Sequence, residues 1–271
     1  MTSVAAMPDS LPQSPSPPPE LAPRTRRILE GPVVATLLRL ALPNLGEAAA
    51  RIAFVSFDAV FVGWIGTDAL AGVSLAFPIF LLMQMTSASG IGAGVNGAVA
   101  RAMGAGRRDD AAAIAFHACV LALAIAGCFT VLMLLAGPAI YRALGAVGGG
   151  LDAAVTYSAL VFGGVVAVWS MNLLANVVRG LGNMLVPATA IVVGEAVHLA
   201  LSPTLILGLG PVPALGVAGA AIAVVASYAA GTAVLLAHLL SGRAEIRLAP
   251  CRLRRAPFRA ILGVGVPAAL N

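Results

Sequence analysis

The stretch AAAIAFHACVLALAIAGCFTVLMLLA, residues 111–136, contains no Asp, Glu, Arg or Lys. A helix needs about 20 mostly apolar residues to cross the hydrocarbon core of a bilayer, so this stretch predicts a transmembrane helix. Similar stretches follow the chain on both sides, at residues 33–62, 70–100, 153–177, 186–209 and 214–240, and a further one begins near Pro257. The sequence therefore predicts an all-α polytopic membrane protein, a six-helix transmembrane bundle with an incomplete seventh helix.

The composition agrees with a membrane protein. Of the 271 residues, 60% are hydrophobic and 10% are charged, whereas soluble domains carry roughly 25% charged residues. This balance excludes a soluble enzyme, a disordered chain and a nucleic-acid-binding domain, so we expect no nucleic-acid partner. The three cysteines have no metal-binding spacing, and no nucleophile–base pair is evident, so we expect no catalytic activity, no metal and no cofactor.

The chain divides into three predicted parts. Residues 1–27 form a Pro-rich tail that we expect to be disordered, residues 28–242 a six-helix lobe, and residues 243–271 an Arg-rich linker with the start of a second lobe. All 16 basic residues are arginines, and a cytoplasmic N-terminus places all but Arg51 and Arg142 on the inner side. The predicted location is a plasma membrane, the inner membrane of a bacterium, with a cytoplasmic N-terminus.

An internal similarity supports two lobes. LLRLALP at residues 37–43 and ILGVGVP at residues 261–267 each place a proline after the same apolar approach and an Arg-bearing segment. This pattern predicts two six-helix halves in parallel topology, with chance similarity between two helix starts as the alternative. The lobe would then need a C-terminal lobe, or a second copy, as its partner within the lipid bilayer.

Ionisable residues in the first span indicate a functional face, because such groups are costly in a bilayer. Glu47, Arg51 and Asp58 share one side of a helix, and the first two can neutralise each other as an i,i+4 pair. Asp58 is then the carboxylate of this span that has no arginine to neutralise it. The alternative is that Asp58 lies at the outer interface and is hydrated.

The fifth span carries a second polar face formed by Glu195, His198 and Ser202. Ser202 lies about 9 Å along the helix from the predicted end of its span near Gly208, and Asp58 lies about 8 Å from Gly63 at the end of the first span. The two residues are therefore expected at similar depths in the membrane. A carboxylate, an imidazole and a hydroxyl at one level indicate a proton or cation site. A packing role is the alternative for His198.

The second span combines small and polar residues. GAGVNG at residues 92–97 matches the GxGxxG pattern of a dinucleotide-binding loop, but we reject that interpretation because the match lies inside a predicted span. Gly90 and Gly94 have the GxxxG spacing that allows close helix packing, which explains the glycines better. Gln84 and Met83 are candidates for lining a substrate cavity together with Glu47 and Arg51. Contact with lipid is the alternative for the methionine.

Four segments, in this order, resemble the multidrug and toxic-compound extrusion (MATE) family. They are FVGWIGTDALAGVSLAFPI (61–79), AVARAMGAGRRDDA (98–111), VVRGLGNMLVP (177–187) and LGVAGAAIAVVAS (215–227). The resemblance implies a twelve-helix antiporter that exports small organic, often cationic, compounds in exchange for protons or sodium. It implies that Asp58 is an ion-coupling residue, that Pro43 is where the first helix bends, and that Asn176 joins the polar network that couples to the ion.

The fifth span departs from the family pattern. Where family members often carry asparagine and then aspartate, this chain has His198 and Ser202, and Val224 stands where a threonine is frequent. Fewer hard oxygen ligands disfavour sodium, and a histidine near a carboxylate suits proton exchange, so H+ is favoured over Na+. The alternatives are a flippase for lipid-linked precursors and a half-size membrane subunit that transports nothing.

Overall fold

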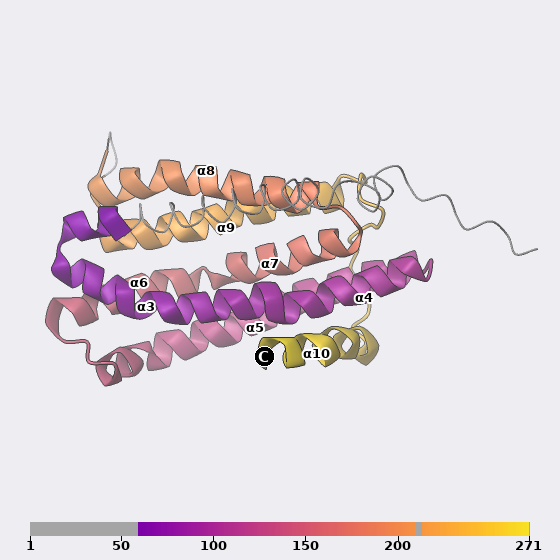
Figure 1. Cartoon of the computed structure of the whole chain (residues 1–271), viewed down its shortest axis with the longest axis horizontal. Helices are drawn as coiled ribbons and strands as arrows, with labels where there is room; N and C mark the ends of the chain where they lie inside the picture. The colour runs from indigo at the N-terminus through magenta and orange to yellow at the C-terminus, as the bar shows by residue number, and fades with distance from the viewer. Residues whose placement is uncertain (1–58, 210–212, 271) are drawn as a thin grey trace, which may run out of the picture. The chain divides into compact units, whose positions relative to one another are not determined.

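The computed structural model describes residues 59–209 and 213–270. The contacts of the chain group Phe54–Asn271 into one compact unit, to which all of these residues belong. All secondary-structure elements assigned within these two ranges are helices (Figure 1). Among the described residues, four helical segments are long and apolar enough to cross a membrane, or five if one bent pair counts as one span. The predicted all-α polytopic membrane fold is confirmed, while most of the predicted first span, and with it the count of six, lies outside the described residues.

The second predicted span is one long helical path with an irregular centre. It consists of α3 (Thr67–Met85), the π-helix η1 (Thr86–Ile91) and α4 (Gly92–Gly104). A short helix over 59–65, which includes the end of the first predicted span, precedes it and is separated from it by Gly66. A π-helix closes its hydrogen bonds one residue further along the chain than an α-helix and occurs mostly as single turns, often at functional sites. The apolar pattern predicted the span but not this turn.

The third, fifth and sixth predicted spans are α5 (Arg108–Ala143), α8 (Leu185–Leu207) and α9 (Val217–Leu240). Helices α8 and α9 pack along each other (Figure 1). Glycine makes this possible, because a Cβ added at Gly194 would lie 2.9 Å from the carbonyl oxygen of Ser227. Helix α8 ends at Gly208, which has a left-handed φ of 73°, so the predicted end of this span is confirmed.

The fourth predicted span is bent. It consists of α6 (Gly148–Gly163) and α7 (Val165–Gly180), which meet at 47°. Gly164 lies at the bend, where an added Cβ would overlap the side chain of Val225 on α9. Backbone groups beside the bend bond to neighbouring helices, since Thr130 Oγ1 donates to the Phe162 carbonyl at 2.6 Å and Thr232 Oγ1 to the Ala167 carbonyl at 3.0 Å. A bilayer tolerates such a break when these groups are satisfied.

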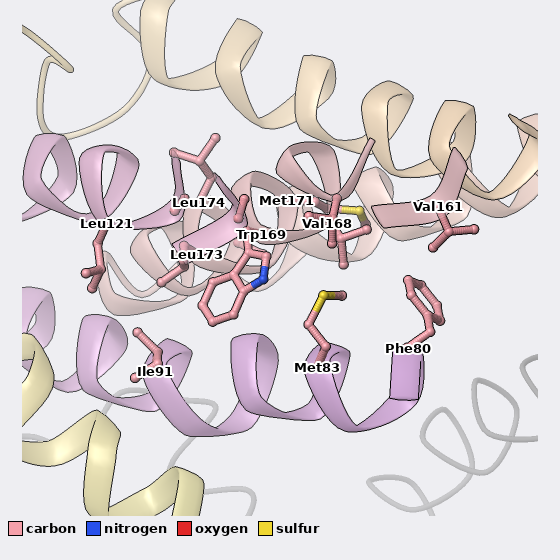
Figure 2. Packing of buried hydrophobic residues seen from close by; sticks show 14 of the residues in the cluster. Phe80, Met83, Ile91, Leu121, Val161, Val168, Trp169, Met171, Leu173 and Leu174 are labelled. Carbon is pink, nitrogen blue, oxygen red and sulfur yellow. The ribbon is translucent and has the colours of Figure 1, made fainter. Parts of the chain in front are cut away.

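The interior of the bundle is centred on α7. Trp169, with no exposed surface, lies opposite the side chains of Met83 and Ile91 from α3 and η1 (Figure 2). Phe80 on α3 and Val161 on α6 belong to the same apolar cluster (Figure 2). Helix α3 packs against α6 and η1 packs against α7, which positions the polar residues described below.

The seventh predicted helix is α10 (Arg255–Leu270), which packs against α4, η1 and α5. Backbone meets backbone here, because a Cβ added at Gly94 would overlap the Ile261 carbonyl oxygen and lie 2.8 Å from the Gly265 nitrogen. A Cβ at Gly90 would lie 2.6 Å from that of Ala269. The prediction that Gly90 and Gly94 serve close helix packing is confirmed, with α10 as the partner.

Candidate functional site

The π-helix η1 presents a buried hydroxyl to α7. Ser87 has no exposed surface, and its Oγ donates to the Gln84 carbonyl at 2.8 Å. The same Oγ accepts a hydrogen bond of 2.7 Å from Nδ2 of Asn172, on α7. Polar groups at membrane depth are stable when they are paired in this way, so the contact fixes the irregular turn against α7.

Asn176 lies one turn further along α7 and contacts the same turn. Its Nδ2 donates to the carbonyls of Ala88, at 3.0 Å, and Asn172, at 2.9 Å, and the residue is 5% exposed. Gly92 must be a glycine for this approach, because a Cβ there would overlap the Asn176 amide. The structure thus places Asn176 in a buried polar network.

A third helix joins the network through Gln84. Its Nε2 donates to the hydroxyl of Tyr228, on α9, at 2.7 Å. Phe80, one turn before Gln84, packs edge to face against the same tyrosine ring with centroids 6.2 Å apart. We call this set the π-helix network: Gln84, Ser87, Asn172, Asn176 and Tyr228.

The π-helix network consists of amide and hydroxyl side chains and contains no carboxylate, imidazole, amine or guanidinium. The network can donate and accept hydrogen bonds. It is therefore suited to bind a polar ligand group or to fix a helix, and proton exchange would have to involve other residues.

The predicted residues of the fifth span lie on or beside one buried stripe of α8. His198 and Ser202 are each 2% exposed, and Glu195 beside them is half-buried. The buried positions of this helix recur every three or four residues, at Pro187, Ala190, Gly194, His198, Ser202 and Ile206. This spacing aligns the imidazole and the hydroxyl one turn apart on the face that packs into the protein.

The remaining predicted site residues divide into two groups. Pro43, Glu47, Arg51 and Asp58 lie outside the described residues. Met83 is described, and it is 1% exposed within the apolar cluster beside Trp169 (Figure 2). Its predicted part in a substrate cavity stays a prediction.

The structure brings Gln84 and Asn176 into one network and places His198 with Ser202 on another helix. Sequence reasoning did not select Asn172 or Tyr228, which complete the network. A signal for Asn172 was present, because Asn172 and Asn176 form an i,i+4 pair of amides within an apolar span. Tyr228 had no comparable signal, since only the packing of α9 brings it to Gln84.

Comparisons with known proteins agree with this architecture. A family model for MatE matches residues 51–204. An FAD transporter of Shewanella oneidensis is 28% identical over 248 residues, which cover 90% of this chain and 54% of that protein. The probable multidrug resistance protein NorM of Thermotoga maritima is 27% identical, with coverage of 87% and 51%. The chain thus spans about half the length of these relatives.

Solved structures of MATE family transporters are also similar to this chain. A MATE family transporter of the MOP superfamily in its inward-facing conformation superposes with a TM-score of 0.74 at 29% identity, over 80% of this chain and 49% of that one. An outward-facing conformation gives a TM-score of 0.76 at 28% identity, over 90% and 54%. The region matched by the family model, residues 51–204, includes η1, α7 and most of α8, which carry much of the polar site. The chain belongs to the MatE family.

Proposed function

We propose that this chain forms the first lobe of a secondary antiporter that exports small organic, often cationic, compounds in exchange for protons. Membership of the MatE family carries this proposal, because MATE relatives among the matches are multidrug resistance proteins and transporters. The protein would lie in a bacterial inner membrane with its N-terminus in the cytoplasm. Its partner would be a second six-helix lobe, so that the transport path forms between two lobes.

The buried polar residues support a division of roles within the lobe. The π-helix network is uncharged, and therefore suits binding and helix positioning. His198 is buried on α8, and imidazole is the side chain whose charge changes most readily near neutral pH. We assign proton exchange to Asp58 together with His198, with Ser202 and Glu195 beside the imidazole on α8.

Exchange requires that the proton bind the two conformations with different affinity. In the proposed cycle, a proton enters the outward-open state and neutralises Asp58. The first helix then repacks, with Pro43 as its bend, and the exported compound leaves. The lobes next turn inward, where the proton dissociates and a new molecule binds. Gln84, in the π-helix network, is a candidate to contact that molecule, and Asn176 stays a predicted member of the ion-coupling polar network.

The test is efflux from proteoliposomes that contain the complete protein, driven by an imposed proton gradient. Asp58→Asn keeps the size of the side chain and removes the charge, and we expect it to abolish gradient-driven efflux. Asp68→Asn is the matched control, since Asp68 is an exposed carboxylate in the first turn of α3. Undiminished, gradient-dependent efflux by the Asp58 variant would remove this residue from the mechanism.

The substrate panel should include FAD beside organic cations, because a relative that aligns with 90% of this chain is an FAD transporter. FAD is anionic, so a preference for it would change the proposed substrate class while keeping the transport function. A flippase for lipid-linked precursors would need a cationic cavity, and neither the π-helix network nor the stripe of α8 contains an arginine. A half-size subunit without transport activity predicts no efflux of any compound.

A further inference from the structure

His117 on α5 is a buried ring that the proposed cycle does not use. It has no exposed surface. Its Nδ1 lies 2.7 Å from the carbonyl oxygen of Ala113 in the same helix, and its Nε2 lies 2.9 Å from the backbone nitrogen of Arg254. A carbonyl only accepts a hydrogen bond and a backbone N–H only donates one. The two contacts together therefore require a neutral ring that carries its hydrogen on Nδ1.

The group bound to Nε2 belongs to the segment that joins α9 to α10. Residues 243–254, here called the interlobe linker, contain no helix, and Arg254 directly precedes α10. Phe258, one turn into α10, packs edge to face on the same imidazole with ring centroids 4.8 Å apart. Cys251 Sγ lies 3.9 Å from Nδ1. One ring thus contacts the end of the linker and the first turn of the next helix.

The linker is attached through an apolar side chain near one end and a backbone amide at the other. The side chains of Arg252, Arg254 and Arg255 are exposed, while the amide of Arg254 is bonded to the buried imidazole. Ile246, near the other end of the linker, is 3% exposed and belongs to the apolar cluster. Ile246 and His117 are therefore two attachment points, one apolar and one polar, on the same lobe.

We propose that His117 is the positioning residue that fastens the interlobe linker to the first lobe and fixes where α10 begins. Naming α10 the first helix of a second lobe rests on the proposed function, but the attachment itself does not depend on transport. A linker held at its end makes α10 start in a fixed place against α4 and η1. The His117 contact therefore fixes the position on the first lobe at which α10, and with it the proposed second lobe, begins.

The first test uses the unmodified full chain in lipid nanodiscs. The sequence contains three histidines, so selective 15N labelling gives few signals, and His117→Phe identifies the one that belongs to His117. We expect that ring to be neutral with hydrogen on Nδ1. A ring protonated on Nε2, alone or as the imidazolium, cannot accept the Arg254 N–H and would overturn the proposal.

The second test measures hydrogen exchange at the Arg254 amide. His117→Phe keeps an aromatic ring against Phe258 but removes the acceptor, and we expect exchange about tenfold faster, equivalent to about 1.4 kcal/mol. His117→Gln supplies an amide oxygen as acceptor and should restore protection to within about threefold of the unmodified chain. His238→Ala, in the last turn of α9, is the matched control and should leave Arg254 unchanged.

Unchanged exchange at Arg254 in the His117→Phe protein, with α8 peptides still protected, would show that the linker is held by something else. Loss of transport in the complete protein with a normal His117 tautomer would reject the proposed function alone. Rapid exchange at Arg254 in the unmodified chain would reject the attachment alone.

Discussion

Replacing Gly94 with alanine tests the contact between α4 and α10. The added methyl group would overlap the Ile261 carbonyl oxygen and lie 2.8 Å from the nitrogen and 3.0 Å from the Cα of Gly265. These are backbone atoms, which cannot move aside as the end of a flexible side chain can. Overpacking of this kind costs about 1–3 kcal/mol. In a chain of this size that corresponds to a fall in melting temperature of roughly 2–12 °C.

The matched control is Gly263→Ala in α10, where an added Cβ meets nothing within 4 Å. Alanine favours a helix over glycine by about 1 kcal/mol, so this control should be neutral or stabilising. The assay is thermal unfolding of both variants in the same detergent or nanodisc. If Gly94→Ala raises the melting temperature as much as Gly263→Ala does, the close approach of α4 and α10 is wrong.

The π-helix network and the bend between α6 and α7 give three further predictions. Asn176→Leu should lower stability by about 1–2 kcal/mol, measured by thermal unfolding, because it leaves the Ala88 carbonyl without this buried donor; equal stability would argue against the network. Tyr228→Phe removes the acceptor of Gln84 and should cost only about 0.6 kcal/mol, so a loss of several kcal/mol would indicate a larger role. Thr130→Val should increase hydrogen exchange of amides at the bend beside Phe162, with Thr189→Val in the first turns of α8 as its control; equal exchange in both would contradict the role of Thr130.

The helices could be predicted because the length of an apolar stretch is a local property. Helix α8 illustrates this, since its end follows from the run of apolar residues and from Gly208. The π-helix and the bend at Gly164 could not be predicted in this way. Each depends on a partner from another helix, Asn176 for the turn and Val225 for the bend, and a single sequence does not indicate which helices become neighbours.

Some residues of the candidate site could be predicted from the sequence, and others could not. His198 and Ser202 were found from their shared helix face, and the buried stripe of α8 contains both. Asn176 was selected by resemblance to a family, whereas Asn172 was overlooked beside it. His117 was read as part of an apolar stretch, because its role arises from a linker more than 130 residues away.

The proposed antiport depends most on protons being the coupling ion. The direct measurement is uptake or efflux by the complete protein in sealed vesicles, under a pH gradient without sodium and then under a sodium gradient at uniform pH. We predict transport in the first condition and none above background in the second. Transport that follows the sodium gradient and does not respond to the pH gradient would contradict proton coupling.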